Sequence, residues 1–187
     1  MGRIVLTEFI SLDGVVEAPG GEDFKYLDWS FEFDRGPDGE RYKELESIGA
    51  SAQLLGRVTY EGFAEAWPQV EGELADALNA MPKYVVSSTL RDPTWAPTTV
   101  LSGDLPEEVS RLRRDVDGDV LVAGSIRLAQ GLLALDLVDE IHLMTFPVVL
   151  GHGRRLWTST PDKSAWRLTE ATTYGDGVHV THYRRAR

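Results

Sequence analysis

The feature that most limits how this chain can fold is an alternation of short strand-like runs with longer amphipathic segments. Strand-like runs occupy residues 3–10, 52–55, 83–87, 98–101 and 119–123, and helix-like patterns occupy residues 40–48, 59–66, 73–81, 105–116 and 126–135. Strands that alternate with helices predict a parallel sheet covered on both faces. Residues 3–10 are apolar on both sides, which favours a central position in that sheet.

The pattern changes after residue 136. Residues 140–149, 166–173 and 178–183 are predicted to be strands, and Gly175, Asp176 and Gly177 form a good hairpin turn between the last two. We therefore predict an α/β fold with three αβα layers, whose mostly parallel central sheet carries an antiparallel C-terminal portion. Residues 11–33 form a long glycine-containing loop, and loops of this length are often functional.

Length, charge and cysteine content exclude several classes of protein. A length of 187 residues is enough for one sizeable core, and we expect a single domain over residues 1–187. A net charge of −11 argues against binding to nucleic acid or to anionic lipid. The absence of cysteine excludes disulfides, thiolate nucleophiles and cysteine-ligated metals. We expect a cytoplasmic protein with neither a signal peptide nor a spanning helix at its N-terminus.

Phosphate-binding residue types follow three of the predicted parallel strands, at the end where such sheets bind ligands. Small residues let a phosphate approach the backbone, while helix N-termini and arginines favour an anion. A single glycine there is more often only a turn, but three such junctions on adjacent strands predict a dinucleotide site. The candidate cofactor-binding residues are Gly56, Arg57, Thr59, Ser87, Ser88, Arg91, Gly124, Ser125 and Ile126.

Among these residues, Arg57, Ser88 and Arg91 would form a pocket for a 2′-phosphate, which favours NADP over NAD. No junction carries a full G-x-G-x-x-G motif or a P-loop. The histidines and carboxylates show no spacing that indicates a metal site, and no G-x-S-x-G motif supports hydrolase chemistry.

The same motifs resemble those of dihydrofolate reductases, and more closely the bacterial relatives of the riboflavin-biosynthesis reductase domain. The resemblance covers nearly the whole chain and rests on SLDG at residues 11–14, LGRVTY at 55–60, the serines at 87–88, GS at 124–125, and residues 131–153. It implies NADPH-dependent hydride transfer to a C=N or C=C–C=O group of a heterocycle such as a pteridine or pyrimidine. Gly124-Ser125 stands where dihydrofolate reductases have two glycines, which makes folate itself an unsuitable substrate.

The resemblance also assigns parts of the cofactor to the three junctions. Gly56, Arg57 and Thr59 would meet the adenine-side phosphates. Ser87 and Ser88 would meet the ribose that carries the 2′-phosphate. The pyrophosphate would lie at residues 124–126.

Hydride transfer needs a proton for the neighbouring atom, supplied by a carboxylate or an ordered water. Asp13 is the first candidate, because it lies in a glycine-containing loop after the central strand, although an Asp-Gly turn residue is an equal alternative. The count back from Gly56 places Glu40 where dihydrofolate reductases have their helix carboxylate. Glu40 and Glu17 are weaker candidates than Asp13, since a glutamate in the first turn of a helix usually only complements the helix dipole. Tyr60 could line the pocket, although a tyrosine on a helix more often packs half-buried.

The sequence thus predicts an NADPH-dependent reductase of a small heterocycle, with Asp13 and Glu40 as candidate catalytic residues. Two alternatives remain: a nucleotide- or small-molecule-binding protein without turnover, and a purely structural dimer module. A homodimer is expected, since the apolar C-terminal strands and Trp157 offer a surface.

Overall fold

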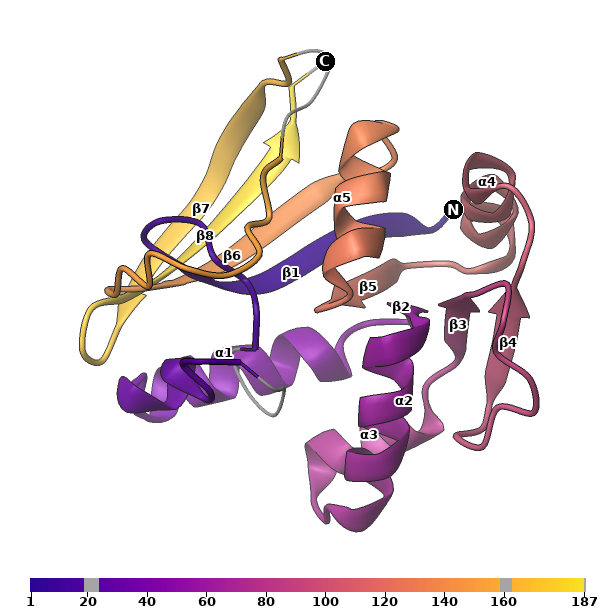
Figure 1. The fold of residues 1–187 in the computed structure, drawn as a ribbon, viewed down its shortest axis with the longest axis horizontal. Helices are drawn as coiled ribbons and strands as arrows, with labels where there is room; N and C mark the ends of the chain where they lie inside the picture. Colours follow the sequence, from indigo (N-terminus) through magenta and orange to yellow (C-terminus); the bar gives the residue numbers. More distant parts are fainter. Residues whose placement is uncertain (19–23, 159–162, 187) are drawn as a thin grey trace.

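The computed structural model describes residues 1–18, 24–158 and 163–186, and its centre is one eight-stranded mixed sheet (Figure 1). The strands are β1 (Arg3–Ser11), β2 (Ala52–Gly56), β3 (Lys83–Val86), β4 (Thr98–Leu101), β5 (Asp119–Ala123), β6 (Glu140–Phe146), β7 (Trp166–Tyr174) and β8 (Val178–Arg185). The helices are α1 (Gly36–Ile48), α2 (Arg57–Ala66), α3 (Glu73–Ala80), α4 (Leu105–Asp115) and α5 (Ile126–Ala134), with short 3₁₀ helices at Trp29–Glu32 and Trp67–Gln69.

The strand order confirms the predicted fold class. Six parallel strands lie in the order β4-β3-β2-β5-β1-β6, then β8 pairs antiparallel with β6, and β7 pairs antiparallel with β8 at the edge. As predicted, β1 is central, and Ile4, Val5 and Leu6 are at most 1% exposed. Such complete burial follows from coverage of the strand on both faces.

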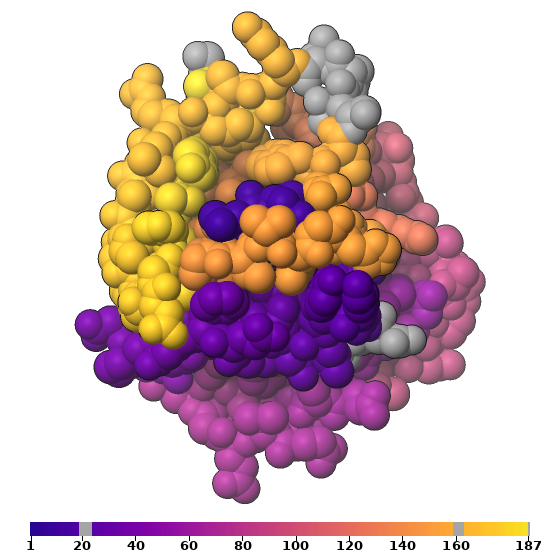
Figure 2. All heavy atoms as spheres, turned by 60° about the vertical axis from the view of Figure 1, so that its left-hand side comes forward, coloured from indigo at the N-terminus to yellow at the C-terminus, as the bar shows by residue number. Residues whose placement is uncertain are grey.

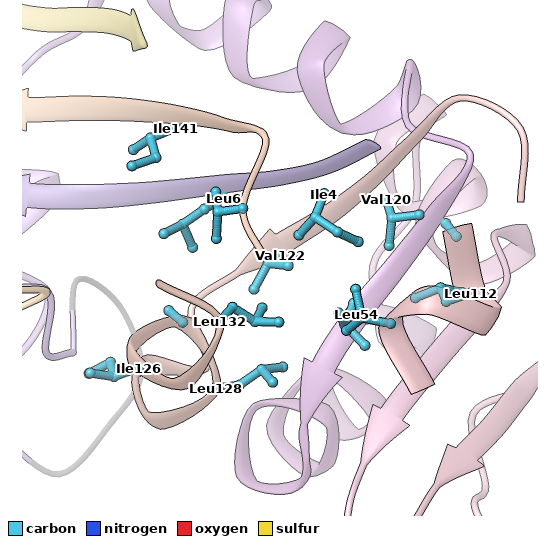
Figure 3. Packing of buried hydrophobic residues seen from close by; sticks show 14 of the residues in the cluster. Ile4, Leu6, Leu54, Leu112, Val120, Val122, Ile126, Leu128, Leu132 and Ile141 are labelled. Atoms are coloured by element: carbon cyan, nitrogen blue, oxygen red, sulfur yellow. The ribbon is translucent and has the colours of Figure 1, made fainter. Parts of the chain in front are cut away.

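Helices cover the two faces of the sheet with different sets of side chains. Figure 3 shows the larger cluster, in which Leu112 of α4 and Ile126, Leu128 and Leu132 of α5 pack against Ile4, Leu6, Leu54, Val120, Val122 and Ile141 of the sheet. Each such buried side chain stabilises the fold by about 1.5–3 kcal/mol relative to an exposed one. In Figure 1, α1, α2 and α3 lie on the opposite side of the sheet from α4 and α5.

Local residue chemistry explains where several elements begin and end. Asp104 caps α4 by accepting a hydrogen bond from the Glu107 N–H at 3.4 Å, as the capping-box spacing predicts. The predicted helix over residues 40–48 begins earlier, at Gly36, because Pro37 is compatible with the first helical turn. The predicted strand over residues 140–149 is three residues too long, since Pro147 cannot continue the ladder.

No helix of the parts of the chain that the structure describes is long and apolar enough to cross a membrane. Of the predicted loop over residues 11–33, residues 19–23 lie outside the described ranges, and Trp29–Glu32 forms a 3₁₀ turn.

Lys83, the first residue of β3, is buried although it carries an amine. Its Nζ donates to the carbonyl oxygens of Asn79 at 2.6 Å and Ala96 at 3.3 Å, and lies 4.1 Å from the ring centroid of Trp95. Only 1% of the residue is exposed, and burial lowers the pKa of Lys83 to about 8. The uncharged amine is therefore favoured in the folded protein more than in the unfolded chain.

Stability is expected to rise between about pH 8 and about pH 10, because the unfolded lysine binds a proton that folded Lys83 has released. Lys83→Met removes this titration. The wild-type unfolding free energy minus that of the variant should increase with pH, with a slope below about 1.4 kcal/mol per pH unit. Urea unfolding at each pH measures the difference, and the exposed-site variant Lys163→Met is the control. A difference that stays flat would contradict the prediction.

Candidate functional site

The turns after β2 and β5 meet at the carboxyl edge of the parallel strands. The backbone N–H of Gly56 donates to Ser125 Oγ at 2.9 Å, and the N–H of Ser125 donates to Thr59 Oγ1 at 3.0 Å. The turns can meet because β2 and β5 are neighbouring parallel strands that end at the same edge. The structure thus brings Gly56, Thr59, Gly124 and Ser125 into one network, which we call the β2–β5 latch.

The backbone of the β2–β5 latch makes a tight turn before α5. Gly124 and Ser125 both adopt left-handed conformations, with φ of 61° and 58°. A Cβ at Gly124 would lie 3.3 Å from Thr59 Cγ2, so this position has little room for a side chain. Ser125 leads into Ile126, the first residue of α5. The first N–H groups of a helix have no partner within it and favour an anion.

Arg57 begins α2 beside the latch and is already paired. Its Nη1 lies 2.9 and 2.8 Å from the two carboxylate oxygens of Glu61, one helical turn further on. Both side chains are nearly half exposed. The sequence analysis overlooked Glu61, although an arginine and a glutamate four residues apart on a helix are a recognisable pair. An incoming phosphate would compete with Glu61 for the guanidinium.

The third predicted junction lies next to the latch, because Val86 at the end of β3 pairs with Gly56 at the end of β2. Here Ser87 Oγ accepts the backbone N–H groups of residues 89 and 90, at 3.1 and 2.9 Å, and so closes a turn. Ser88 is exposed, and the exposed Arg91 donates to the carbonyl oxygen of Leu90 at 3.0 Å. Of the two serines of this junction, Ser88 is the exposed one and Ser87 is partly buried.

Asp13 holds two distant segments together. Its carboxylate accepts hydrogen bonds from the Ser11 hydroxyl at 2.8 Å, from the N–H groups of Leu150 and Gly151 at 3.1 and 3.0 Å, and from Arg155 Nη2 at 3.2 Å. Burial raises its pKa, but these four donors outweigh burial and lower the pKa of Asp13 to about 2. Figure 2 shows the segment after β1 (indigo) enclosed by the segment after β6 (orange).

These contacts favour an anchoring role for Asp13, because a carboxyl with so low a pKa carries no proton at neutral pH. Glu17 is engaged in a similar way, since it accepts from the backbone N–H of Arg154 at 2.7 Å and from its Nε at 2.6 Å.

Glu40 lies in the first turns of α1 and forms a bidentate pair with Arg35. The two Arg35–Glu40 hydrogen bonds measure 3.0 and 2.8 Å, and Arg35 is only 8% exposed. The Arg35 guanidinium also stacks over the Phe9 ring, 5.1 Å from its centroid. None of the contacts recorded for the described residues joins Glu40 to Asp13 or to the β2–β5 latch. Tyr60, which the sequence suggested could line the pocket, is buried, and its hydroxyl accepts the N–H of Trp95 at 2.9 Å.

The structure also groups residues to which the sequence analysis gave no role. Glu46 of α1 contacts His142 of β6, whose ring stacks on His182 of β8 with centroids 3.8 Å apart. No spacing in the sequence indicates this contact, because it depends on the pairing register of β6 and β8. In the described ranges, no group of three or more histidine or acidic residues could hold a metal ion.

Comparison with known proteins identifies the family. Open α/β sheets bind ligands at the carboxyl ends of their strands, where the small-residue turns of this chain lie. The family model of the RibD C-terminal domain matches residues 3–180. The chain therefore belongs to the RibD C-terminal domain family, which confirms the resemblance to riboflavin-type reductase domains.

Two individual proteins match this chain over nearly their whole length. Uncharacterized protein YyaP of Bacillus subtilis (strain 168) is 28% identical over 181 residues, covering 94% of this chain and 91% of that protein. Uncharacterized protein YwjB of the same organism is 25% identical over 187 residues, covering 98% of each.

Two solved structures share the fold. A putative riboflavin biosynthesis protein from Shewanella sp. PV-4 has a TM-score of 0.77 at 20% identity, with 99% of both chains covered. A pyrimidine reductase-like protein from Corynebacterium diphtheriae has a TM-score of 0.65 at 12% identity, with 99% of this chain and 92% of that chain covered.

Asp13→Asn tests the anchoring role. The substituted amide would place a donor against the Gly151 N–H and remove the ion pair with Arg155, so we expect a loss of about 1.5–3 kcal/mol in unfolding free energy. Urea unfolding measures this loss, and the exposed-site variant Glu65→Gln is the matched control. Unchanged stability would contradict the anchor. Lower turnover at a temperature where the variant is still fully folded would instead favour direct participation of Asp13 in proton delivery.

Proposed function

We propose that this chain is an NADPH-dependent reductase that transfers a hydride to a small heterocycle of the pyrimidine or pteridine type. The observation that carries the proposal is the β2–β5 latch, which puts small residues and the start of α5 at the carboxyl edge of the sheet. Membership of the RibD C-terminal domain family supports the same activity. The name of the Corynebacterium diphtheriae relative, a pyrimidine reductase-like protein, supports the substrate class.

The residues of the carboxyl edge fit the parts of a dinucleotide. Gly124 and Ser125 form the left-handed turn before α5, and the α5 N-terminus at Ile126 would bind the pyrophosphate. Arg57 and Thr59 would bind the adenine-side phosphates. Arg57 would also reach the 2′-phosphate, together with Ser87, Ser88 and Arg91, and would exchange Glu61 for it.

When bound, NADPH supplies the hydride, which adds to the electrophilic carbon of a C=N or C=C–C=O group while a proton adds to the heteroatom or the α-carbon. The chain must hold the heterocycle and pass on this proton. We assign the positioning of the substrate loop to Asp13, which ties residues 11–14 to residues 150–155. Asp13 and Glu40 stay proposed as catalytic carboxylates, each acting by orienting a water that delivers the proton, because a carboxylate that is ionised at neutral pH has no proton of its own to donate.

One observation favours the rival function, a binding protein without turnover. Both candidate carboxylates are engaged by arginines, Asp13 by Arg155 and Glu40 by Arg35. The rival predicts that NADPH binds but is not oxidised in the presence of oxidised pterins or pyrimidines. A loss of NADPH absorbance that depends on added substrate would show turnover and would contradict the rival function.

Calorimetric titration tests the cofactor proposal, with NADPH expected to bind much more tightly than NADH. Arg57→Ala should weaken NADPH by about 1.5–3 kcal/mol and NADH far less, because a charge-assisted bond to the 2′-phosphate is lost. Arg114→Ala, which removes one exposed positive charge at the end of α4, is the matched control. Equal losses for the two cofactors would contradict the 2′-phosphate assignment, and no binding of either would contradict the reductase.

The expected homodimer belongs to the same proposal, with β7 as its contact surface. β7 is an edge strand whose residues 167–173 are all exposed, and an exposed long edge readily pairs with another strand. Leu168→Lys on β7 should therefore shift the molar mass measured by light scattering from dimer toward monomer. Leu45→Lys on α1 is the control, because Leu168 and Leu45 are 52% and 50% exposed. A monomeric wild-type protein would contradict the dimer.

A further inference from the structure

A buried polar cluster lies between α1 and the C-terminal half of the sheet, and none of its residues takes part in the proposed reaction. Its hub is Glu46 of α1, whose side chain is 7% exposed. Glu46 Oε1 accepts from the Tyr42 hydroxyl at 3.0 Å and from His142 Nδ1 at 2.7 Å. Glu46 Oε2 accepts from the Thr7 hydroxyl at 2.9 Å and from Lys43 Nζ at 2.6 Å. One carboxylate thus binds four donors from α1, β1 and β6.

The docking of α1 onto the sheet depends on this cluster. α1 fully buries only Gly39 and Ser47, and Leu45 is half exposed, so no large apolar side chain of the helix is fully buried. Most helices of globular proteins are held to their sheet by an apolar stripe. Here the hydrogen bonds of α1 to β1, β6 and β8 pass through this cluster, beside the packing of Tyr42 against apolar residues of β6 and β8. The strength of these hydrogen bonds depends on which groups carry protons.

Two stacked histidines complete the cluster. His142 and His182 are register partners in β6 and β8, and their rings stack 3.8 Å apart at an angle of 13°. The Tyr42 hydroxyl donates its hydrogen bond to Glu46. Its oxygen therefore acts as the acceptor toward His182 Nε2, at 2.7 Å. His142 donates through Nδ1 to Glu46. In the neutral pair, His142 Nε2 and His182 Nδ1 are therefore the nitrogens without a proton.

Each of these two nitrogens faces a carboxylate. His142 Nε2 lies 3.5 Å from Glu140 Oε2, and His182 Nδ1 lies 3.4 Å from Glu170 Oε2. A proton on either nitrogen would replace a repulsive contact with a charge-assisted hydrogen bond. Two protons would place two imidazolium rings face to face, where like charges repel strongly in a partly buried site.

Other charged and aromatic side chains surround the His142–His182 pair. Glu140 is also bound by Arg3 of β1 at 2.8 Å and by Arg184 of β8 at 2.7 Å, so it is partly neutralised. From α1, Lys43 lies on the far side of Glu46, and from β7 the ring of Tyr174 stacks on Tyr42 with centroids 6.0 Å apart. These surroundings leave room for one additional positive charge and disfavour a second.

We propose that His142 and His182 together bind one proton beyond those of the neutral pair, and that binding of a second additional proton releases α1 from the sheet. The energetics agree with this direction: burial first and the neighbouring His142 second lower the pKa of His182. A depressed histidine pKa means that the unfolded or undocked chain binds the second proton better, so docking is stable above the ordinary histidine range and weakens as pH falls below it. Because α1 carries Glu40, this device would couple acid pH to the shape of the candidate site.

Titration of the histidine side chains by ¹⁵N-correlated NMR tests the shared proton in the unmodified protein. His142 and His182 should titrate in two steps separated by more than about one pH unit, with resonances of both rings responding to both steps. Independent single steps for His142 and His182 would overturn the proposal.

Glu170→Gln provides a variant that does not endanger folding, because the Glu170 side chain is 61% exposed. Loss of this carboxylate should shift the first step of the pair to lower pH. Glu44→Gln on the exposed side of α1 makes the same change of charge and should leave both steps in place. Equal effects of the two variants would overturn the assignment of Glu170.

Hydrogen exchange tests the release of α1. Between about pH 7 and about pH 5, the protection of residues 36–48, corrected for the intrinsic exchange rate, should fall by at least about tenfold, whereas that of α5 should stay constant. In His182→Gln the loss should be absent, and in the control His179→Gln it should persist. Constant protection of α1, or an equal loss in α5, would overturn the proposal. None of these readouts depends on cofactor or substrate, so they remain valid whether or not the reductase proposal holds.

Discussion

The burial of β1 between β5 and β6 is the constraint on which the rest of the structure depends. Because this strand is enclosed on both faces, its residues are apolar or held in polar contacts, and helices must cover both sides. Parallel pairing with β5 then fixes which turns reach the carboxyl edge together. The β2–β5 latch and the Asp13 anchor both lie at this edge, since β2, β5 and β1 all end there.

Much of the fold could be predicted from the sequence, because burial on both faces and strict alternation leave few choices. The strands over residues 98–101 and 119–123 have the predicted bounds, and the antiparallel C-terminal part follows from the hairpin signal at residues 175–177. The errors concern ends of elements, where Pro37 and Pro147 act through local sterics. The clustering of residues 56, 59, 124 and 125 was also predictable, since parallel strands end on one edge.

Other parts of the candidate site could not be predicted, because they depend on pairs of residues far apart in the chain. Asp13 is an evident candidate acid until Arg155 and the N–H groups of Leu150 and Gly151 are placed around it. The contact of His142 with His182 requires the register between β6 and β8, and a shift by one residue would turn either ring to the opposite face. Sequence patterns report periodicity along one segment and carry little information on register.

The sheet order has a consequence for synthesis on the ribosome. β1 is made first, but its two partners, β5 and β6, begin at residues 119 and 140, and the backbone groups that anchor Asp13 follow at residues 150 and 151. Contacts so distant in sequence slow folding, and they leave an apolar strand without a partner while most of the chain is made. The carboxyl edge of the sheet can close only after residues 150 and 151 have left the ribosomal tunnel, so a nascent chain in the cell must keep β1 from pairing with other strands until then.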